Sequence, residues 1–362
     1  MTGTENDRFP TKTESFFSLM PMEGQSPEKQ ERWNQEWFSQ LLDRMVDRLL
    51  SRTGSENVRA VFLCGSFATG EGSVIIENNR PLLISDLDLV MVVDSRRLHR
   101  KILVMKKELS SICEASGEEA VFAGGISVGV LHTSELPDLP PSPLVMDMKE
   151  RAVTLFGGQR FKDKIDVATV SKDQGIRLLE NRISAFLGSA SLRGEKDPVR
   201  KVLLAYSTAK VYTDILSAYL IHLGCYVPGY LDRLKLAEKI RESSIYPFPE
   251  TLQDKIRKWT MYKISPYFPD NEIIGDEQWK EAGRDLLYYW RVFSSVKGAG
   301  GEPAPVKELL RETVSRHHLR ERIMRWSGKL GILRLLAGIP GAAFSNRGIL
   351  RFTPRELINL SG

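Results

Sequence analysis

Apolar positions along the first half of the chain change from helical to strand-like spacing. After the polar residues 1–26, the run Ser26-Pro27-Glu28 is typical of a helix start, with a capping serine and proline at the first helical position. An apolar stripe then recurs at helical spacing as far as Leu50, and Gly54 ends it. Apolar runs rich in β-branched residues predict four strands, separated by helices predicted over 98–115 and 145–151. These strands are expected over residues 58–64, 82–93, 120–131 and 153–156.

Residues beyond about Lys172 change to a helical period throughout. Helices are predicted over residues 177–187, 198–223, 230–240, 250–263 and 277–296. The pattern therefore predicts an α+β fold, with a small α/β domain over 27–165 followed by an α-helical domain over 166–296. We expect residues 1–26 to form a tail and 297–362 to form a Gly/Pro-rich linker with a basic helical segment.

The charge of the chain is concentrated at its C-terminal end. The 362 residues include 51 Lys and Arg and 46 Asp and Glu, a formal charge of +5. Between Glu302 and Glu356 there are eleven Lys or Arg and five Glu, so this segment carries +6 and the rest of the chain about −1. The segment interleaves Arg with apolar residues. It could pack as a solvated face, bind RNA or another polyanion, or lie on an anionic membrane.

Composition excludes several classes of protein. Three widely spaced cysteines (Cys64, Cys113, Cys225) exclude a disulfide scaffold and a Cys-rich zinc module, and they favour a reducing, cytoplasmic location. The sequence contains no uninterrupted run of the roughly 18–20 apolar residues that a transmembrane helix needs. The polar N-terminus has no apolar core of the kind found in secretory signals.

Two short motifs carry the chemistry. Gly65-Ser66 follows the first predicted strand, where backbone N–H groups and a hydroxyl suit phosphate oxygens. Asp86 and Asp88 lie within the second predicted strand, and residues two apart in a strand share one face. Two carboxylates on one face are ligands for a hard cation such as Mg²⁺, which would neutralise their charge. Phosphate, carboxylates and Mg²⁺ together indicate phosphoryl or nucleotidyl transfer.

At these residues the chain resembles the nucleotidyltransferase superfamily typified by DNA polymerase beta. The motif Gly65-Ser-Phe-Ala-Thr-Gly-Glu71 and the motif Ser85-Asp-Leu-Asp-Leu-Val90 are similar to its two signature segments, and Met148 to Gly157 resembles the segment that closes the domain. The resemblance implies a small mixed-sheet catalytic domain, with Gly65 and Ser66 binding the triphosphate of an NTP. It also implies that Asp86 and Asp88 are catalytic and hold one or two Mg²⁺ ions.

Two departures from the superfamily pattern stand out. Residues 73–81 read as an insertion between the motifs, which a surface loop tolerates. The family usually carries a third carboxylate on a later strand, as metal ligand and general base, but the corresponding run Ile126 to Val130 offers Ser and Gly. Glu135 beyond that strand is the candidate base, and Asp138, Glu118 and Glu119 are the alternatives.

The expected function is therefore Mg²⁺-dependent transfer of an NMP from an NTP to an acceptor hydroxyl. The acceptor could be a small molecule, a protein side chain or an RNA 3′ end. Lys210, on a predicted helix of the second domain, is a further candidate for nucleotide binding. The missing third carboxylate keeps open an alternative, a catalytically silent relative that binds nucleotide or nucleic acid.

Overall fold

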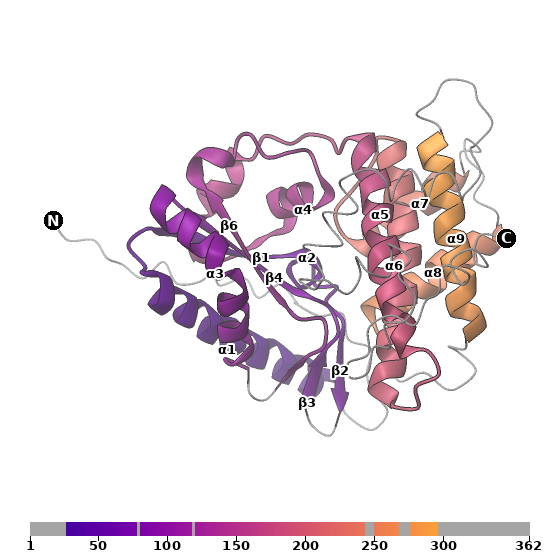
Figure 1. Ribbon diagram of the computed structural model, residues 1–362, viewed down its shortest axis with the longest axis horizontal. Helices are drawn as coiled ribbons and strands as arrows, with labels where there is room; N and C mark the ends of the chain where they lie inside the picture. The colour runs from indigo at the N-terminus through magenta and orange to yellow at the C-terminus, as the bar shows by residue number, and fades with distance from the viewer. Residues whose placement is uncertain (1–26, 78–79, 118–119, 243–249, 268–275, 296–362) are drawn as a thin grey trace, which may run out of the picture. The chain divides into compact units, whose positions relative to one another are not determined.

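The computed structural model describes residues 27–77, 80–117, 120–242, 250–267 and 276–295, and its chain forms two compact units (Figure 1). Among the described residues, the first unit comprises 27–171, 223–242 and 260–267 with residue 250, and the second comprises 172–222, 251–259 and 276–295. The predicted tail (1–26) and the predicted basic segment (297–362) lie outside the described residues. In the described ranges, no helix has the length and apolar character needed to cross a membrane.

The first unit contains two small mixed sheets, so the α+β prediction is confirmed. The larger sheet has the strand order β6-β4-β1-β7, with β4 parallel to β6 and the other pairs antiparallel. The smaller has the order β2-β3-β5. The strands are β1 (Val58–Cys64), β2 (Val74–Glu77), β3 (Arg80–Leu83), β4 (Leu87–Val93), β5 (Val121–Phe122), β6 (Ile126–His132) and β7 (Val153–Gly157).

The predictions of single strands over 82–93 and 120–131 are wrong, because each run divides between the two sheets. The backbone N–H groups of Ile84 and Ser85 both donate to the carbonyl of Ser73, which turns the chain between β3 and β4. The second run breaks at Gly124 and Gly125, where Gly125 has a φ of +80°. The predicted insertion over 73–81 forms β2 and the start of β3, so it is largely a strand pair and not a loop.

One face of the larger sheet is covered by the helices α1 (Pro27–Thr53) and α3 (Arg96–Glu114), which contact each other (Figure 1). Both helices were predicted, within one or two residues at the ends. The odd-numbered residues of β4 pack in this core. The side chain of Asp88 therefore points to the opposite face, since neighbouring strand residues alternate between the two faces.

Further helices complete the first unit, and two of them come from much later in the chain. The short helix α2 (Gly65–Ala68) follows β1 directly, and α4 (Pro143–Arg151) contacts both α2 and β1. The helix α7 (Tyr230–Glu242) and the last residues of α8 (Glu250–Ile264) also belong to this unit. The units thus separate at Ser171 rather than at residue 165, and part of the expected helical domain packs with the first unit.

The second unit is built around α6 (Pro198–His222), whose side chains are buried on nearly all sides. It packs against α5 (Lys172–Gly188) and α9 (Asp276–Ser295). Two polar contacts reinforce this bundle: a largely buried ion pair at 2.6 Å between Arg182 and Asp214, and a hydrogen bond from the Tyr212 hydroxyl to Asp285. The helical character predicted beyond Lys172 is confirmed for the described residues.

Candidate functional site

Strand pairing brings the two sequence motifs together. Cys64, the last residue of β1, pairs with Asp88 of β4, so the Gly65 turn begins beside that carboxylate. Gly65 has a φ of +67°, and a Cβ atom built on it would lie 2.7 Å from Oδ2 of Asp88. Only glycine fits this approach without displacing the carboxylate, which explains the residue type at the turn. Ser66, half-buried, is the next residue of α2.

Asp86 precedes β4 by one residue and is half-buried, as is Asp88. The backbone of Asp86 packs closely against Gly124, because a Cβ atom built on Gly124 would lie 2.5 Å from the amide nitrogen of Asp86. Just after Asp86, the Leu87 N–H donates to the carbonyl of Gly125. Asp88 lies within β4, whereas Asp86 lies just before the strand, after the bend at Ser85. The two carboxylates therefore do not share one unbroken strand.

Lys263 links the loops that carry the two motifs. Its side chain is fully buried, and its Nζ donates to the carbonyl of Glu71 at 2.9 Å and to Oγ of Ser85 at 3.1 Å. The ammonium also lies 4.6 Å from the ring centre of Tyr230. In turn the hydroxyl of Ser73 donates to the carbonyl of Lys263. The end of α8 is thereby joined to both sides of the site.

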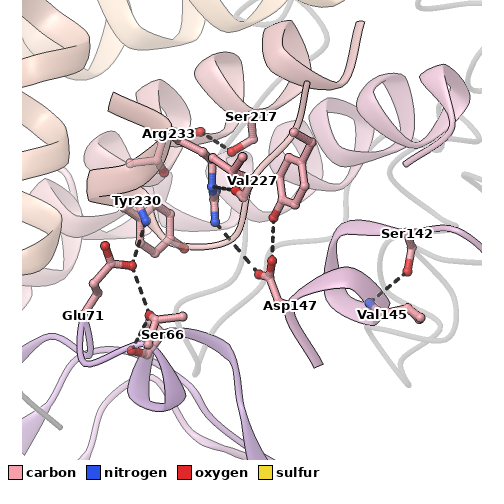
Figure 2. Close-up of polar contacts among 12 residues, drawn as sticks. Ser66, Glu71, Ser142, Val145, Asp147, Ser217, Val227, Tyr230 and Arg233 are labelled. Carbon is pink, nitrogen blue, oxygen red and sulfur yellow. Dashed lines mark hydrogen bonds and ion pairs between the residues drawn. The ribbon is translucent and has the colours of Figure 1, made fainter. Parts of the chain in front are cut away.

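Glu71, part of the first motif, has a structural role of its own (Figure 2). Its carboxylate accepts hydrogen bonds from the backbone N–H groups of Tyr230 at 2.7 Å and Leu231 at 2.8 Å, at the first turn of α7. Thr69 donates to the same carboxylate, and the Glu71 N–H donates to the carbonyl of Ser66. Carboxylates are favourable at a helix N-terminus, so Glu71 attaches α7 to the loop after Ser66.

A second, largely buried carboxylate lies on α4 (Figure 2). Asp147 accepts a hydrogen bond of 3.0 Å from the Tyr226 hydroxyl and lies 3.9 Å from the guanidinium of Arg233. Burial raises the pKa of Asp147, although the Arg233 charge and the Tyr226 hydroxyl lower it. Arg233, itself buried, also lies over the rings of Tyr226 and Tyr230. The cluster fixes α7 against α4.

Two carboxylates lie near Cys64, at the start of the Gly65 turn. Burial raises the pKa of the Cys64 thiol far above its usual range, and the charges of Asp88 and Asp147 raise it further. The thiol is therefore an inert, protonated core group and not a nucleophile. The charge of Asp88 favours a cation near the turn, whereas Asp147 already faces the guanidinium of Arg233.

Glu135 lies away from these groups. It follows β6, whose Ser127 pairs with Asp88 and whose last residue, His132, is five residues further on, about 16 Å along the strand. There its carboxylate accepts from the His132 N–H at 2.9 Å and pairs with Arg96 at 3.1 Å. Glu135 therefore closes a capping box with His132 at the short 3-10 turn after β6, and the structure does not bring it to the aspartates as the sequence suggested.

Ser127 is the β6 residue beside Asp88, and its side chain is exposed. Within the ranges the structure describes, no group of three or more His, Cys, Asp or Glu side chains could hold a metal ion. Two carboxylates still fit Mg²⁺, which keeps several waters and commonly binds through one or two carboxylates plus substrate phosphates. The alternatives Glu118 and Glu119 lie outside the described residues, and Asp138 is exposed beyond Glu135.

Lys210 belongs to the second unit, on α6, where its Nζ lies 5.4 Å from the ring centre of Tyr206. Sequence reasoning missed Lys263, Asp147 and Arg233. For Lys263 the sequence gives one signal, its position on α8. It follows the aromatic residues of this helix, whose opposite face is charged. A helical pattern shows that such a residue faces the interior, but it does not identify the partner.

No protein-family model and no curated protein matches this sequence. The assignment of a function therefore depends on the site itself.

Proposed function

We propose that the first unit is a nucleotidyltransferase-like domain that binds an NTP with Mg²⁺ and transfers its NMP to an acceptor hydroxyl. The observation that carries this proposal is the approach of Asp88 to Gly65, which unites a phosphate-type turn with a carboxylate pair. Either motif alone occurs in many unrelated proteins. Their contact at the end of β1, next to the bend that presents Asp86, supports a single site.

Each group has a distinct role in this proposal. The backbone N–H groups and hydroxyl at Gly65 and Ser66 would bind phosphate oxygens, and Asp86 and Asp88 would hold the metal ion. When bound, Mg²⁺ would neutralise the phosphate charge and stabilise the departing pyrophosphate. Lys263 and Glu71 would act indirectly, by holding the two motif loops at a fixed separation.

The decisive experiment is Mg²⁺-dependent release of pyrophosphate from each NTP, with and without RNA, by the full chain. We expect release to stop with EDTA and to fall at least about 100-fold in the double variant Asp86→Asn, Asp88→Asn. Asp138→Asn is a matched control, because it removes an exposed acid beyond Glu135 and should leave the rate unchanged. Absence of both nucleotide binding and turnover would refute the proposal.

One observation favours a second candidate function. Because Ser127 stands beside Asp88, a serine occupies the place where a further acid could activate an acceptor. A module that binds NTP without transferring it would show Mg²⁺-dependent nucleotide binding, lost in the double variant, with no pyrophosphate release. A Ser127→Asp variant that gains turnover would support this reading, since it supplies the third carboxylate.

A further inference from the structure

The outer face of α3 carries an unusual combination of side chains. The helix buries Leu98, Ile102, Leu109 and Cys113 against the larger sheet. Helical spacing places a second set of residues on the opposite side, where all of them are exposed. This set, the α3 outer face, consists of Arg97, Arg100, Lys101, Leu103, Val104 and Lys107.

Interactions within the first unit do not explain why the α3 outer face carries four cations. No acidic residue occurs in the first turn of α3, although acids are favoured there and cations are disfavoured by the helix dipole. Two acids of the helix, Glu108 and Glu114, are also exposed, and Glu108 pairs with Arg52. The four cations of the outer face outnumber them. The outer face therefore presents a net positive charge.

Two aliphatic side chains lie among these cations. Val104 is 87% exposed and Leu103 is 44% exposed. Val104 follows Arg100 by four residues and precedes Lys107 by three, so it is a helical neighbour of both. Exposed aliphatic groups add nothing to contacts with phosphates, which dominate the affinity for nucleic acids, whereas they gain free energy when they leave water.

We propose that the α3 outer face docks on an anionic lipid surface. The Lys and Arg side chains would lie at the level of the headgroups, and Val104 and Leu103 would enter the boundary with the acyl chains. Such contact is peripheral, reversible and weakened by salt, because its cations act through a screened potential. The aliphatic pair favours a lipid surface over nucleic acid, which attracts the same charges.

This surface is separate from the proposed nucleotide site. Asp88 points to the face of the larger sheet opposite to α3, so contact through α3 leaves Asp88 uncovered by the lipid. The inference therefore does not depend on the proposed function. It can hold whether or not the first unit transfers nucleotides.

The test is sedimentation of the full chain with vesicles of phosphatidylcholine, alone and mixed with phosphatidylglycerol. We expect binding to the mixed vesicles only, and a loss of at least about 10-fold in the double variant Arg97→Glu, Arg100→Glu. The double variant Leu103→Ser, Val104→Ser, which keeps the charge, should weaken binding about 5-fold or more. Unchanged far-UV circular dichroism would show that both variants fold.

A matched charge reversal controls for the net charge of the chain. Lys235→Glu, Lys239→Glu changes two exposed lysines of α7 by the same amount and should leave vesicle binding within about 2-fold of the unaltered chain. Failure of the unaltered chain to bind the mixed vesicles would overturn the proposal. So would equal loss in the α7 and α3 charge variants. If the α3 charge reversal instead lowers RNA binding while vesicle binding stays unchanged, α3 is a nucleic-acid surface.

Discussion

Lys263 and Ser85 are 178 residues apart in sequence, yet Nζ of the lysine donates to Oγ of the serine at 3.1 Å. The same ammonium donates to the carbonyl of Glu71, in the loop that follows Ser66. One buried cation thus connects the residue before Asp86 with the loop of the other motif. The relative position of the two motifs depends on a helix contributed from much later in the chain.

Replacing Lys263 with methionine should destabilise the first unit. The change leaves the buried carbonyl of Glu71 without its ammonium donor, and it removes one donor from the Ser85 hydroxyl, which keeps its hydrogen bond from the Ser73 N–H. A buried acceptor without a donor costs about 1–3 kcal/mol. We expect the free energy of unfolding, measured by urea titration, to fall by about 2–4 kcal/mol. Lys235→Met removes an exposed lysine of α7, in the same unit, and should change it by less than about 0.5 kcal/mol. Equal effects of the two variants would contradict a specific role for Lys263.

Alanine at Gly65 should disturb the site more than alanine at Gly125. Both glycines have positive φ, so both variants carry a backbone strain of about 1 kcal/mol. A Cβ at Gly65 also meets the Asp88 carboxylate, whereas a Cβ at Gly125 meets nothing within 4 Å. We expect Gly65→Ala, but not Gly125→Ala, to weaken Mg²⁺-dependent NTP binding at least about 10-fold in calorimetry. Equal binding by the two variants would rule out the proposed role of this contact.

The Asp147 cluster should respond unequally to removal of its members. Asp147→Asn leaves the buried guanidinium of Arg233 without its carboxylate, a loss of about 3–5 kcal/mol. Tyr226→Phe removes one hydrogen bond to Asp147 and should cost about 1–2 kcal/mol. Thermal and urea unfolding of both variants test the ranking. A larger effect of the tyrosine change would mean that the guanidinium does not rely on Asp147.

Glu135 should affect stability in a pH-dependent way without affecting nucleotide binding. Although burial raises its pKa, the His132 N–H and the charges of His99 and Arg96 lower it below the ordinary 4.5. A lowered pKa means that the carboxylate stabilises the fold above pH 4.5, and that this contribution is lost as the pH falls through the pKa of the folded state. Because the group is partly exposed, we expect less than about 1 kcal/mol.

The measurement is the difference in unfolding free energy between the unaltered chain and Glu135→Gln across acid and neutral pH. This difference should be present at neutral pH and should shrink below pH 4.5. A difference that instead grows with acidity would show that Glu135 is protonated in the folded protein. A loss of nucleotide binding at constant stability would return Glu135 to the site.

Local sequence patterns predicted those helices and strands whose apolar residues keep one spacing throughout. The first strand and the helices were found because their apolar residues follow a single period from end to end. The runs 82–93 and 120–131 were read as single strands because the apolar character continues across each break. At those breaks the backbone leaves one sheet for the other through long-range hydrogen bonds, such as those from Ile84 and Ser85 to Ser73.

The candidate site could be predicted in part for the same reason. Gly65 and Asp88 each carry a local signature, and β-strand pairing then brings them together. Arg233 carries none, and the position of Lys263 on its helix indicates burial without identifying its partners. Proximity in sequence to β6 suggested Glu135 as the base. Because β6 runs parallel to β4, its C-terminal end lies far from Asp88.

The interleaved chain of the first unit has a consequence for how the protein is made. Synthesis proceeds from the N-terminus, and domains generally begin to fold as they emerge from the ribosome. Here the strands and both motifs emerge first, while the backbone donors for Glu71, the cation for Asp147 and the ammonium for Ser85 arrive only with residues 223–267. A nascent chain stopped at residue 171 would lack these later donors and would hold Glu71 and Ser85 through the nearby Thr69 and Ser73. The unit is complete only after the intervening helices of its neighbour have also been translated.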